Sequence, residues 1–194
     1  MVSGFADYQP EVERQTVDAA ITVRPAVLAD LEVCAELIVS RSGGSVEART
    51  HRLMADLRDP ARYTAVACAG DEVIGYGGVI RHDVSPGDPP EMAPSGYYLV
   101  GLIVASDWRR RGVGELLTVD RMRWTADRAD SVYYFANLAN GATLDLHQSL
   151  GFTEVTRDFT FPSDPLQPGT GVLLRADLTK RSDLTRRSDL TTGR

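Results

Sequence analysis

Three consecutive arginines and two closely spaced glycines follow an apolar segment near the middle of the chain. Residues 97–104 (YYLVGLIV) are typical of a buried strand, and residues 115–124 are typical of a helix. The first N–H groups of a helix lack intrahelical partners, and glycine lets a phosphate approach them closely. The connecting loop therefore predicts a pyrophosphate site, although an ordinary turn with solvated arginines would have the same composition. Its residues are Arg109, Arg110, Arg111, Gly112, Val113 and Gly114.

The order of residues in this loop differs from the two common nucleotide-binding loops. Neither Gly-x-x-x-x-Gly-Lys-Ser/Thr nor Gly-x-Gly-x-x-Gly occurs in the chain. The loop reads Arg109-x-x-Gly112-x-Gly114 instead. A second pattern lies downstream, where a helix is expected to start after the cap residue Asn140 and to stop at Gly151. It reads Asn140-x-x-Thr143-x-x-Leu146-His147-x-x-Leu150-Gly151-Phe152.

Together the two patterns resemble the GCN5-related N-acetyltransferases (GNATs). Members of that family share an acyl-CoA pyrophosphate loop, Gln/Arg-x-x-Gly-x-Gly/Ala, and a later helix, Asn-x-x-Ala-x-x-Leu-Tyr-x-x-x-Gly-Phe. Here Thr143 stands in place of Ala and His147 in place of Tyr. The histidine is similar to the branch that resembles phosphinothricin acetyltransferases. The resemblance covers residues 21–178.

The resemblance implies an α/β (α+β) fold with a mixed, mostly antiparallel sheet. Six to seven strands and about four flanking helices are expected, with the sheet splayed at its central strands. The last two expected strands, 152–161 and 171–178, form an antiparallel pair. We expect a polar arm over 1–20, an acyl-CoA N-acyltransferase domain over 21–178 and a basic hexad-repeat tail over 179–194.

The implied reaction moves an acetyl group from acetyl-CoA to a primary amine, favoured here as that of a small molecule, by direct attack in a ternary complex. An alkylamine with a pKa near 10.4 is almost wholly protonated at pH 7, so a base or a chain of waters must take its proton. The resemblance further implies a backbone oxyanion donor within residues 102–104, pairing of the pantetheine arm with that strand edge, and contacts from two asparagines. The expected cofactor-binding residues are Leu102, Ile103, Val104, Arg109, Arg110, Arg111, Gly112, Val113, Gly114, Asn137, Asn140, Thr143 and His147.

His147 is the first candidate catalytic residue. Its spacing from Thr143 and Leu150 places it on an inward-facing side of the helix, which favours a core histidine with a satisfied hydrogen bond. The functional alternative is that it donates to the CoA sulfur, as the family Tyr does. For the general base we expect a water relay, with Tyr98 and His82 as candidates.

Two further segments each allow a purely structural and a functional interpretation. Gly75, Gly77 and Gly78 in an expected strand indicate either a bulge or the close approach of a ligand or another backbone. The Pro- and acid-rich stretch 82–96 is either a solvated connection or a wall of an acceptor pocket that attracts a cation.

The composition of the chain limits the other classes of protein to which it could belong. The chain has 194 residues, of which 43% are hydrophobic, as expected of one globular domain, and its net charge of −6 argues against nucleic-acid binding. No apolar run approaches the ~18 residues of a membrane span, and no signal peptide is recognisable, so a cytoplasmic protein without a membrane partner is expected. Cys34 and Cys68 are interpreted as buried, reduced residues, and no metal site is predicted.

Two other functions stay open at this stage. One is a protein acetyltransferase that acts on N-termini or lysines, and the other is a CoA-binding regulatory protein without turnover. The resemblance also allows a homodimer, with the final strands as contact surfaces.

Overall fold

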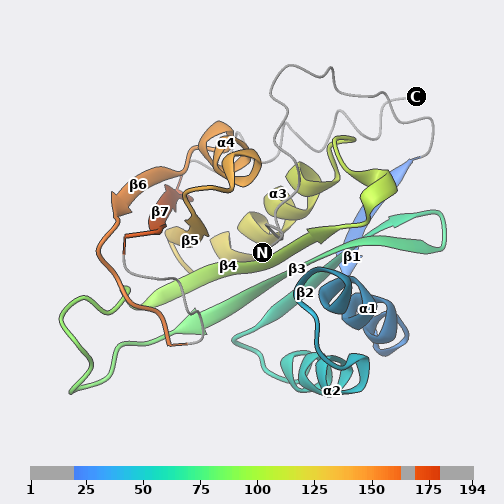
Figure 1. Ribbon diagram of the computed structural model, residues 1–194, viewed down its shortest axis with the longest axis horizontal. Coiled ribbons are helices and arrows are strands. Elements are labelled where there is room, and N and C mark those ends of the chain that lie inside the picture. The colour runs from blue at the N-terminus through green and yellow to red at the C-terminus, as the bar shows by residue number, and fades with distance from the viewer. Residues whose placement is uncertain (1–19, 163–168, 180–194) are drawn as a thin grey trace.

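The computed structural model of the chain describes residues 20–162 and 169–179 (Figure 1). Within these ranges, seven strands form one sheet in the order β1-β2-β3-β4-β5-β7-β6. The strands are β1 Ile21–Pro25, β2 Tyr63–Ala69, β3 Glu72–His82, β4 Gly96–Val104, β5 Ser131–Asn137, β6 Thr153–Thr156 and β7 Gly171–Asp177. The α-helices are α1 Leu31–Ser42, α2 Val46–Asp56, α3 Val113–Ala126 and α4 Gly141–Ser149.

The sheet is antiparallel except where β4 meets β5. These two strands run parallel and pair only at Tyr98 with Tyr133 and at Leu99 with Tyr134. Beyond Leu99 the edge of β4 that faces β5 has no ladder partner. The expected fold class is therefore confirmed, including the splayed central strands.

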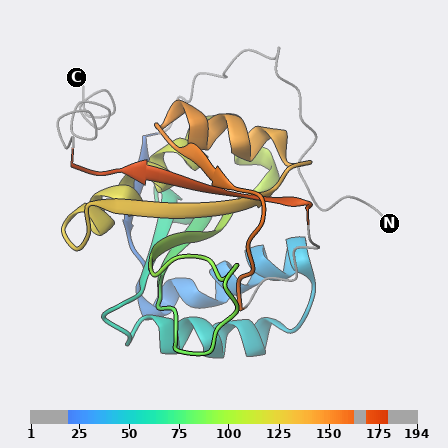
Figure 2. The ribbon, with the colours of Figure 1, turned by 90° about the vertical axis from the view of Figure 1, so that its left-hand side faces the viewer.

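Helices cover both faces of this sheet, as Figure 2 shows edge-on. On one face, α1 and α2 bury Cys34 and Leu53 against Val66 and Tyr76 of the sheet. On the other face, α3 buries Val113 and Leu117 in a second cluster, and α4 adds Leu144 beside a third. The removal of these apolar side chains from water is the main force that fixes the helices on the sheet.

A carboxylate on the buried side of α3 finds its partner on β2. The hydroxyl of Tyr63 donates a hydrogen bond of 2.7 Å to Asp120, and the Tyr63 ring stacks on Trp124 with centroids 5.1 Å apart. Desolvation raises the pKa of Asp120, although this hydrogen bond opposes the shift.

The strand expected over 152–161 is shorter than predicted. β6 ends at Thr156, because the Thr156 hydroxyl accepts a hydrogen bond of 3.0 Å from the N–H of Asp158 and turns the chain away from β7. Phe161 then packs with Tyr98 and Leu173 on the face that α1 and α2 cover in part. The polar arm and the hexad tail fall almost entirely outside the described residues.

No helix within those residues has both the length and the apolar character that crossing a membrane requires.

Candidate functional site

The loop between β4 and α3 ends at a helix start that no side chain caps. Gly112 is the N-cap residue of α3 with φ of 80°, and no side chain caps the helix. The first hydrogen bond of the helix runs from Leu116 N–H to the Gly112 carbonyl at 3.1 Å, so the helix itself offers no acceptor to the N–H groups before it. A Cβ on Gly112 would meet no heavy atom within 4 Å, so glycine is required there for its backbone conformation.

The loop arginines surround this helix start with positive charge. Arg109 and Arg110 are exposed, and the Arg111 guanidinium lies over the Trp108 ring at 5.1 Å from its centroid. The Nε of Arg111 is buried and has no hydrogen-bond partner among the described residues. A buried donor without an acceptor is costly, so an anion at this position would satisfy it.

The second part of the site is the unpaired edge of β4. The N–H of Ala105 donates to the Ile74 carbonyl at 2.9 Å, and Ile103 pairs with Tyr76. The peptide groups of Ile103 and Ala105 therefore point toward β3. Leu102 and Val104 therefore direct their peptide groups to the opposite edge, which we call the open edge. Strand edges of this kind bind extended ligands through main-chain hydrogen bonds.

Two arginines cover the open edge in this structure. The Leu102 carbonyl accepts from Arg41 at 3.3 Å, and the Val104 carbonyl accepts from Arg109 at 3.2 Å. Both side chains are exposed at other points and can move away. No sequence pattern points to Arg41, because it lies at the end of α1, far along the chain from β4.

The third part is α4, where His147 is completely buried. Its Nδ1 lies 2.7 Å from the Thr143 carbonyl, and its ring stacks on Tyr134 with centroids 3.6 Å apart. Desolvation lowers the pKa of His147 to about 3, so the imidazole is neutral and Nδ1 carries the proton donated to Thr143. Nε2 is then an acceptor, and it has no partner among the described residues.

The structure brings these three parts together at Gly114. A Cβ on Gly114 would lie 3.5 Å from Leu146 of α4 and 3.8 Å from Leu102 of β4. Asn137 uses its side-chain oxygen to accept from Ala139 N–H at 2.8 Å, and Asn140 is the N-cap residue of α4 without a capping hydrogen bond from its side chain.

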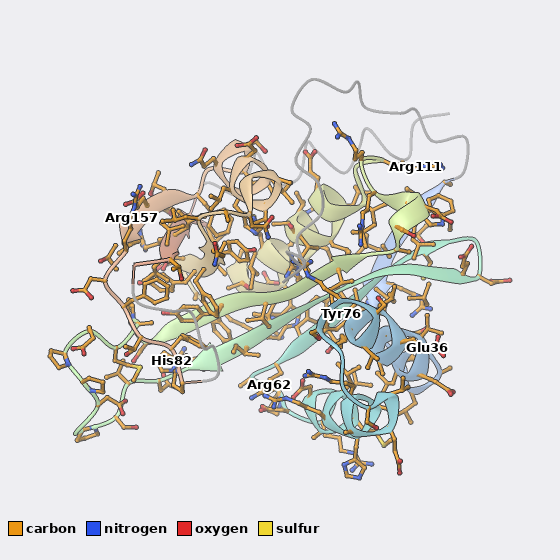
Figure 3. All side chains as sticks on the ribbon, in the orientation of Figure 1. Glu36, Arg62, Tyr76, His82, Arg111 and Arg157 are labelled. Atoms are coloured by element: carbon orange, nitrogen blue, oxygen red, sulfur yellow. The ribbon has the colours of Figure 1, made fainter. Side chains whose placement is uncertain are left out.

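Of the two candidate bases, His82 lies at the end of β3 far from the loop arginines, as Figure 3 shows relative to Arg111. Tyr98 lies on β4 opposite Tyr133, shortly before the open edge. Tyr98 is fully buried and donates to the Pro94 carbonyl at 2.6 Å. The Nε2 of His82 lies 3.0 Å from the Ala93 carbonyl. Both side chains thus hold the loop after β3, and burial raises the pKa of Tyr98. Their role as general base stays a prediction.

The sequence matches the acetyltransferase (GNAT) family over residues 30–152. The chain belongs to this family. The expectations of a GNAT fold, of an acyltransferase and of acetyl-CoA as its co-substrate are thereby confirmed at the level of the family. No curated protein sequence matches this one.

Solved structures of other proteins have a similar fold. A ribosomal-protein-alanine N-acetyltransferase from Brucella melitensis has a TM-score of 0.63 at 20% identity and covers 81% of this chain and 99% of its own. A protein from Salmonella typhimurium, assigned as an acetyltransferase and solved with acetyl-CoA, has a TM-score of 0.64 at 16% identity, covering 84% and 96%. A protein assigned as a phosphinothricin N-acetyltransferase has 0.61 at 20% identity, covering 82% and 99%. At these identities the likeness concerns the fold alone.

Proposed function

We propose that the protein transfers the acetyl group of acetyl-CoA to a primary amine of a small molecule. The observation that carries this proposal is the uncapped start of α3 at Gly112 directly beside the open edge of β4. One binds an anion through backbone N–H groups, and the other pairs with an extended amide chain. We propose residues 21–178 as the catalytic domain.

In this proposal the pyrophosphate lies against residues 111–114, where the Arg111 Nε supplies a donor. The pantetheine amides replace Arg41 and Arg109 at the carbonyls of Leu102 and Val104. Asn140, whose side chain does not cap α4, is available for a further contact. A backbone N–H of β4 then faces the thioester carbonyl, and this donor stabilises the charge that develops on oxygen as the amine attacks.

Direct attack in a ternary complex is supported by the state of the cysteines. A covalent acetyl-enzyme would need an accessible, activated nucleophile. The sequence has two cysteines, and both are buried, Cys34 at 0% and Cys68 at 2% exposure. Burial raises the pKa of Cys34 to about 12.

A small acceptor is supported by what lies at the two ends of β4. At its last residues, α1 and α2 pack on the sheet in a cluster with Ile103. At the other end, the loop after β3 is fastened to the segment after β6, because Ala93 N–H donates to Thr160 at 2.9 Å and Thr160 N–H donates to Glu91 at 2.9 Å. Two fixed flanks suit a compact amine better than a long peptide.

The charge of that loop is less available for a cationic acceptor than its composition suggests. Arg81 donates two hydrogen bonds to Asp83, at 2.9 and 2.8 Å. Asp88 accepts from Ser85 N–H at 2.7 Å. The acceptor is therefore proposed only as a primary amine, whose proton leaves through a water relay.

The test is release of CoA thiol from acetyl-CoA with a panel of free amino acids, polyamines, aminoglycosides and short peptides. We expect turnover with at least one small amine. When both substrate concentrations are varied, double-reciprocal plots of the initial rates should give intersecting lines. Turnover with peptides alone would favour a protein acetyltransferase. Tight binding of acetyl-CoA with no turnover on any amine would favour a regulatory protein, and parallel lines would contradict direct attack.

A further inference from the structure

Arg121 of α3 is the largest completely buried side chain of the molecule's described part, and the proposed reaction does not yet use it. It lies one turn after Leu117, on the face of α3 that packs on the sheet. Burial lowers the pKa of Arg121 to about 10, so the guanidinium is still charged at neutral pH. Among the described residues its hydrogen bonds go to neutral oxygens, and the adjacent Asp120 accepts from Tyr63 instead.

The side chain extends from α3 to the sheet, where its guanidinium contacts backbone carbonyls. Its Nη1 donates to the carbonyls of Gly78 at 3.2 Å and Val100 at 3.1 Å, which are register partners on β3 and β4. Nε donates to Leu117 at 3.0 Å, and Nη2 donates to the Thr118 hydroxyl at 3.1 Å. The charge is thus dispersed over neutral acceptors, two of which belong to the sheet.

Those two carbonyls mark the place where the register of the sheet changes. Between the pairs Gly78–Val100 and Tyr76–Ile103, β4 contains one residue more than β3, which is a β-bulge at residues 100–102. Gly101 has φ of 64° and is exposed in the middle of the strand. The bulge lies immediately before the open edge at Leu102.

Arg121 holds one end of the peptide between Val100 and Gly101, next to the open edge. In a trans peptide the C=O and N–H point in opposite directions, and no cis bond occurs among the described residues. Because the Val100 carbonyl faces the guanidinium, the N–H of Gly101 points away from it. A hydrogen bond from a charged donor also polarises the peptide and strengthens this N–H as a donor.

The sheet is built to admit this side chain. A Cβ on Gly77 would lie 2.9 Å from both Cζ and Nε of Arg121, so any larger residue there would displace the guanidinium. Glycine in a strand interior weakens the strand, and a buried charge is costly to desolvate. A leucine or methionine on α3 opposite an alanine on β3 would fill the same space without either cost.

We infer that Arg121 is a positioning residue for acetyl transfer: it fixes and polarises the β4 bulge, so that the N–H groups of Gly101 and Leu102 face the thioester carbonyl. The inference rests on the proposed function, because it assigns Arg121 a task in that reaction. It gives a reason for the glycine on β3 and the buried arginine on α3 at this point.

The test uses acetyl-CoA labelled with ¹³C at the acetyl carbonyl and bound to the full chain, with infrared difference spectra of the labelled carbonyl stretch. In the parent protein the stretch should move to lower frequency than in free acetyl-CoA. In Arg121→Met the shift should be smaller, and kcat with any amine that the parent acetylates should fall about tenfold while the Kd for acetyl-CoA is retained.

Three variants separate positioning from packing. In Gly77→Ala combined with Arg121→Met, the added methyl group refills the space, so the stability should be restored but the carbonyl shift should not. Arg121→Lys, the choice if Met does not fold, keeps the charge but has no fork to span both carbonyls, so its shift should also be reduced. Arg128→Met, which removes a cation stacked 3.7 Å over Trp124 at the far end of α3, should match the parent.

A carbonyl frequency and a kcat equal to the parent's in folded Arg121→Met would overturn the inference. Recovery of both in the double variant would do the same, because packing alone would then explain the arginine. Failure of the parent itself to bind acetyl-CoA would instead contradict the proposed function, so the two failures can be told apart.

Discussion

The Nδ1 of His147 lies 2.7 Å from the carbonyl oxygen of Thr143, one turn earlier on α4. This contact fixes the proton of the neutral ring on Nδ1 and leaves Nε2 as an acceptor. The histidine therefore has the surroundings of a core residue. A donor role at the CoA sulfur would need the other tautomer or a second proton, and it stays a hypothesis.

The burial of His147 predicts a pH dependence of stability. Its pKa is about 3 in the folded protein and near 6.5 in an unfolded chain, so the unfolded state binds the extra proton between these values. The stabilisation is complete above pH 6.5 and is lost as the pH falls toward 3. From pH 7 to pH 5, urea unfolding should show the parent losing about 2 kcal/mol more than His147→Phe. The exposed His51→Gln control should lose as much as the parent, and equal losses in all three proteins would contradict the account.

The same variant addresses catalysis. Phe keeps the ring that stacks on Tyr134 but has no nitrogen. Because Nε2 carries no proton in this structure, kcat of His147→Phe should stay within about threefold of the parent, which is under 1 kcal/mol of barrier. A fall of kcat by two orders of magnitude with unchanged Kd for acetyl-CoA would show instead that His147 protonates the leaving thiolate.

Arg41 should oppose the binding of acetyl-CoA slightly. Its hydrogen bond to the Leu102 carbonyl must break before a pantetheine amide can pair there, and an exposed bond of this kind is worth less than about 1 kcal/mol. Titration calorimetry should find the Kd of Arg41→Met unchanged or up to about threefold lower. Arg58→Met, an exposed residue after α2, serves as the control. Markedly weaker binding by Arg41→Met alone would mean that Arg41 contacts the cofactor directly.

The Tyr63–Asp120 hydrogen bond should stabilise the fold. Tyr63→Phe keeps the stack on Trp124 but leaves a half-buried carboxylate without its donor, at an expected loss of about 1–3 kcal/mol at pH 7. Combining it with Asp120→Leu should recover most of that loss, since no unpaired charge remains. Chemical unfolding of the three variants measures the coupling, and strictly additive losses would contradict it.

The local chemistry of the site could be predicted from the sequence. A glycine at the start of a helix, after three arginines and a buried strand, can be recognised from neighbours in the chain alone, and Gly112 indeed occupies the N-cap position of α3. The resemblance at 140–152 added the fold and the position of α4. The position of Gly112 and the fold both depend on short-range order and on patterns that a single sequence shows, whereas the binding roles of these residues stay predictions.

Other features depend on contacts between distant segments. Asp120 has its partner 57 residues earlier in the chain, at Tyr63. The glycines of β3 were open to a bulge or a close approach, and both occur. The register of β3 with β2 shifts between Val73 and Gly75, and Arg121 of α3 approaches Gly77. Arg121 follows Leu117 at helical spacing on the apolar face of α3. A charged residue on such a face is a signal that the sequence alone contains.

The measurement that tests the central claim most directly is calorimetric titration of the parent, Gly112→Asp and Gly112→Asn with acetyl-CoA. Asp and Asn have the same shape and both tolerate the left-handed conformation, so the pair isolates the charge in front of the helix start. We predict micromolar binding by the parent, binding within about fivefold for Asn, and a loss of at least about 30-fold for Asp, from repulsion of the pyrophosphate. Equal binding by Asp and Asn would place the pyrophosphate elsewhere, and no binding by the parent would contradict the proposed function.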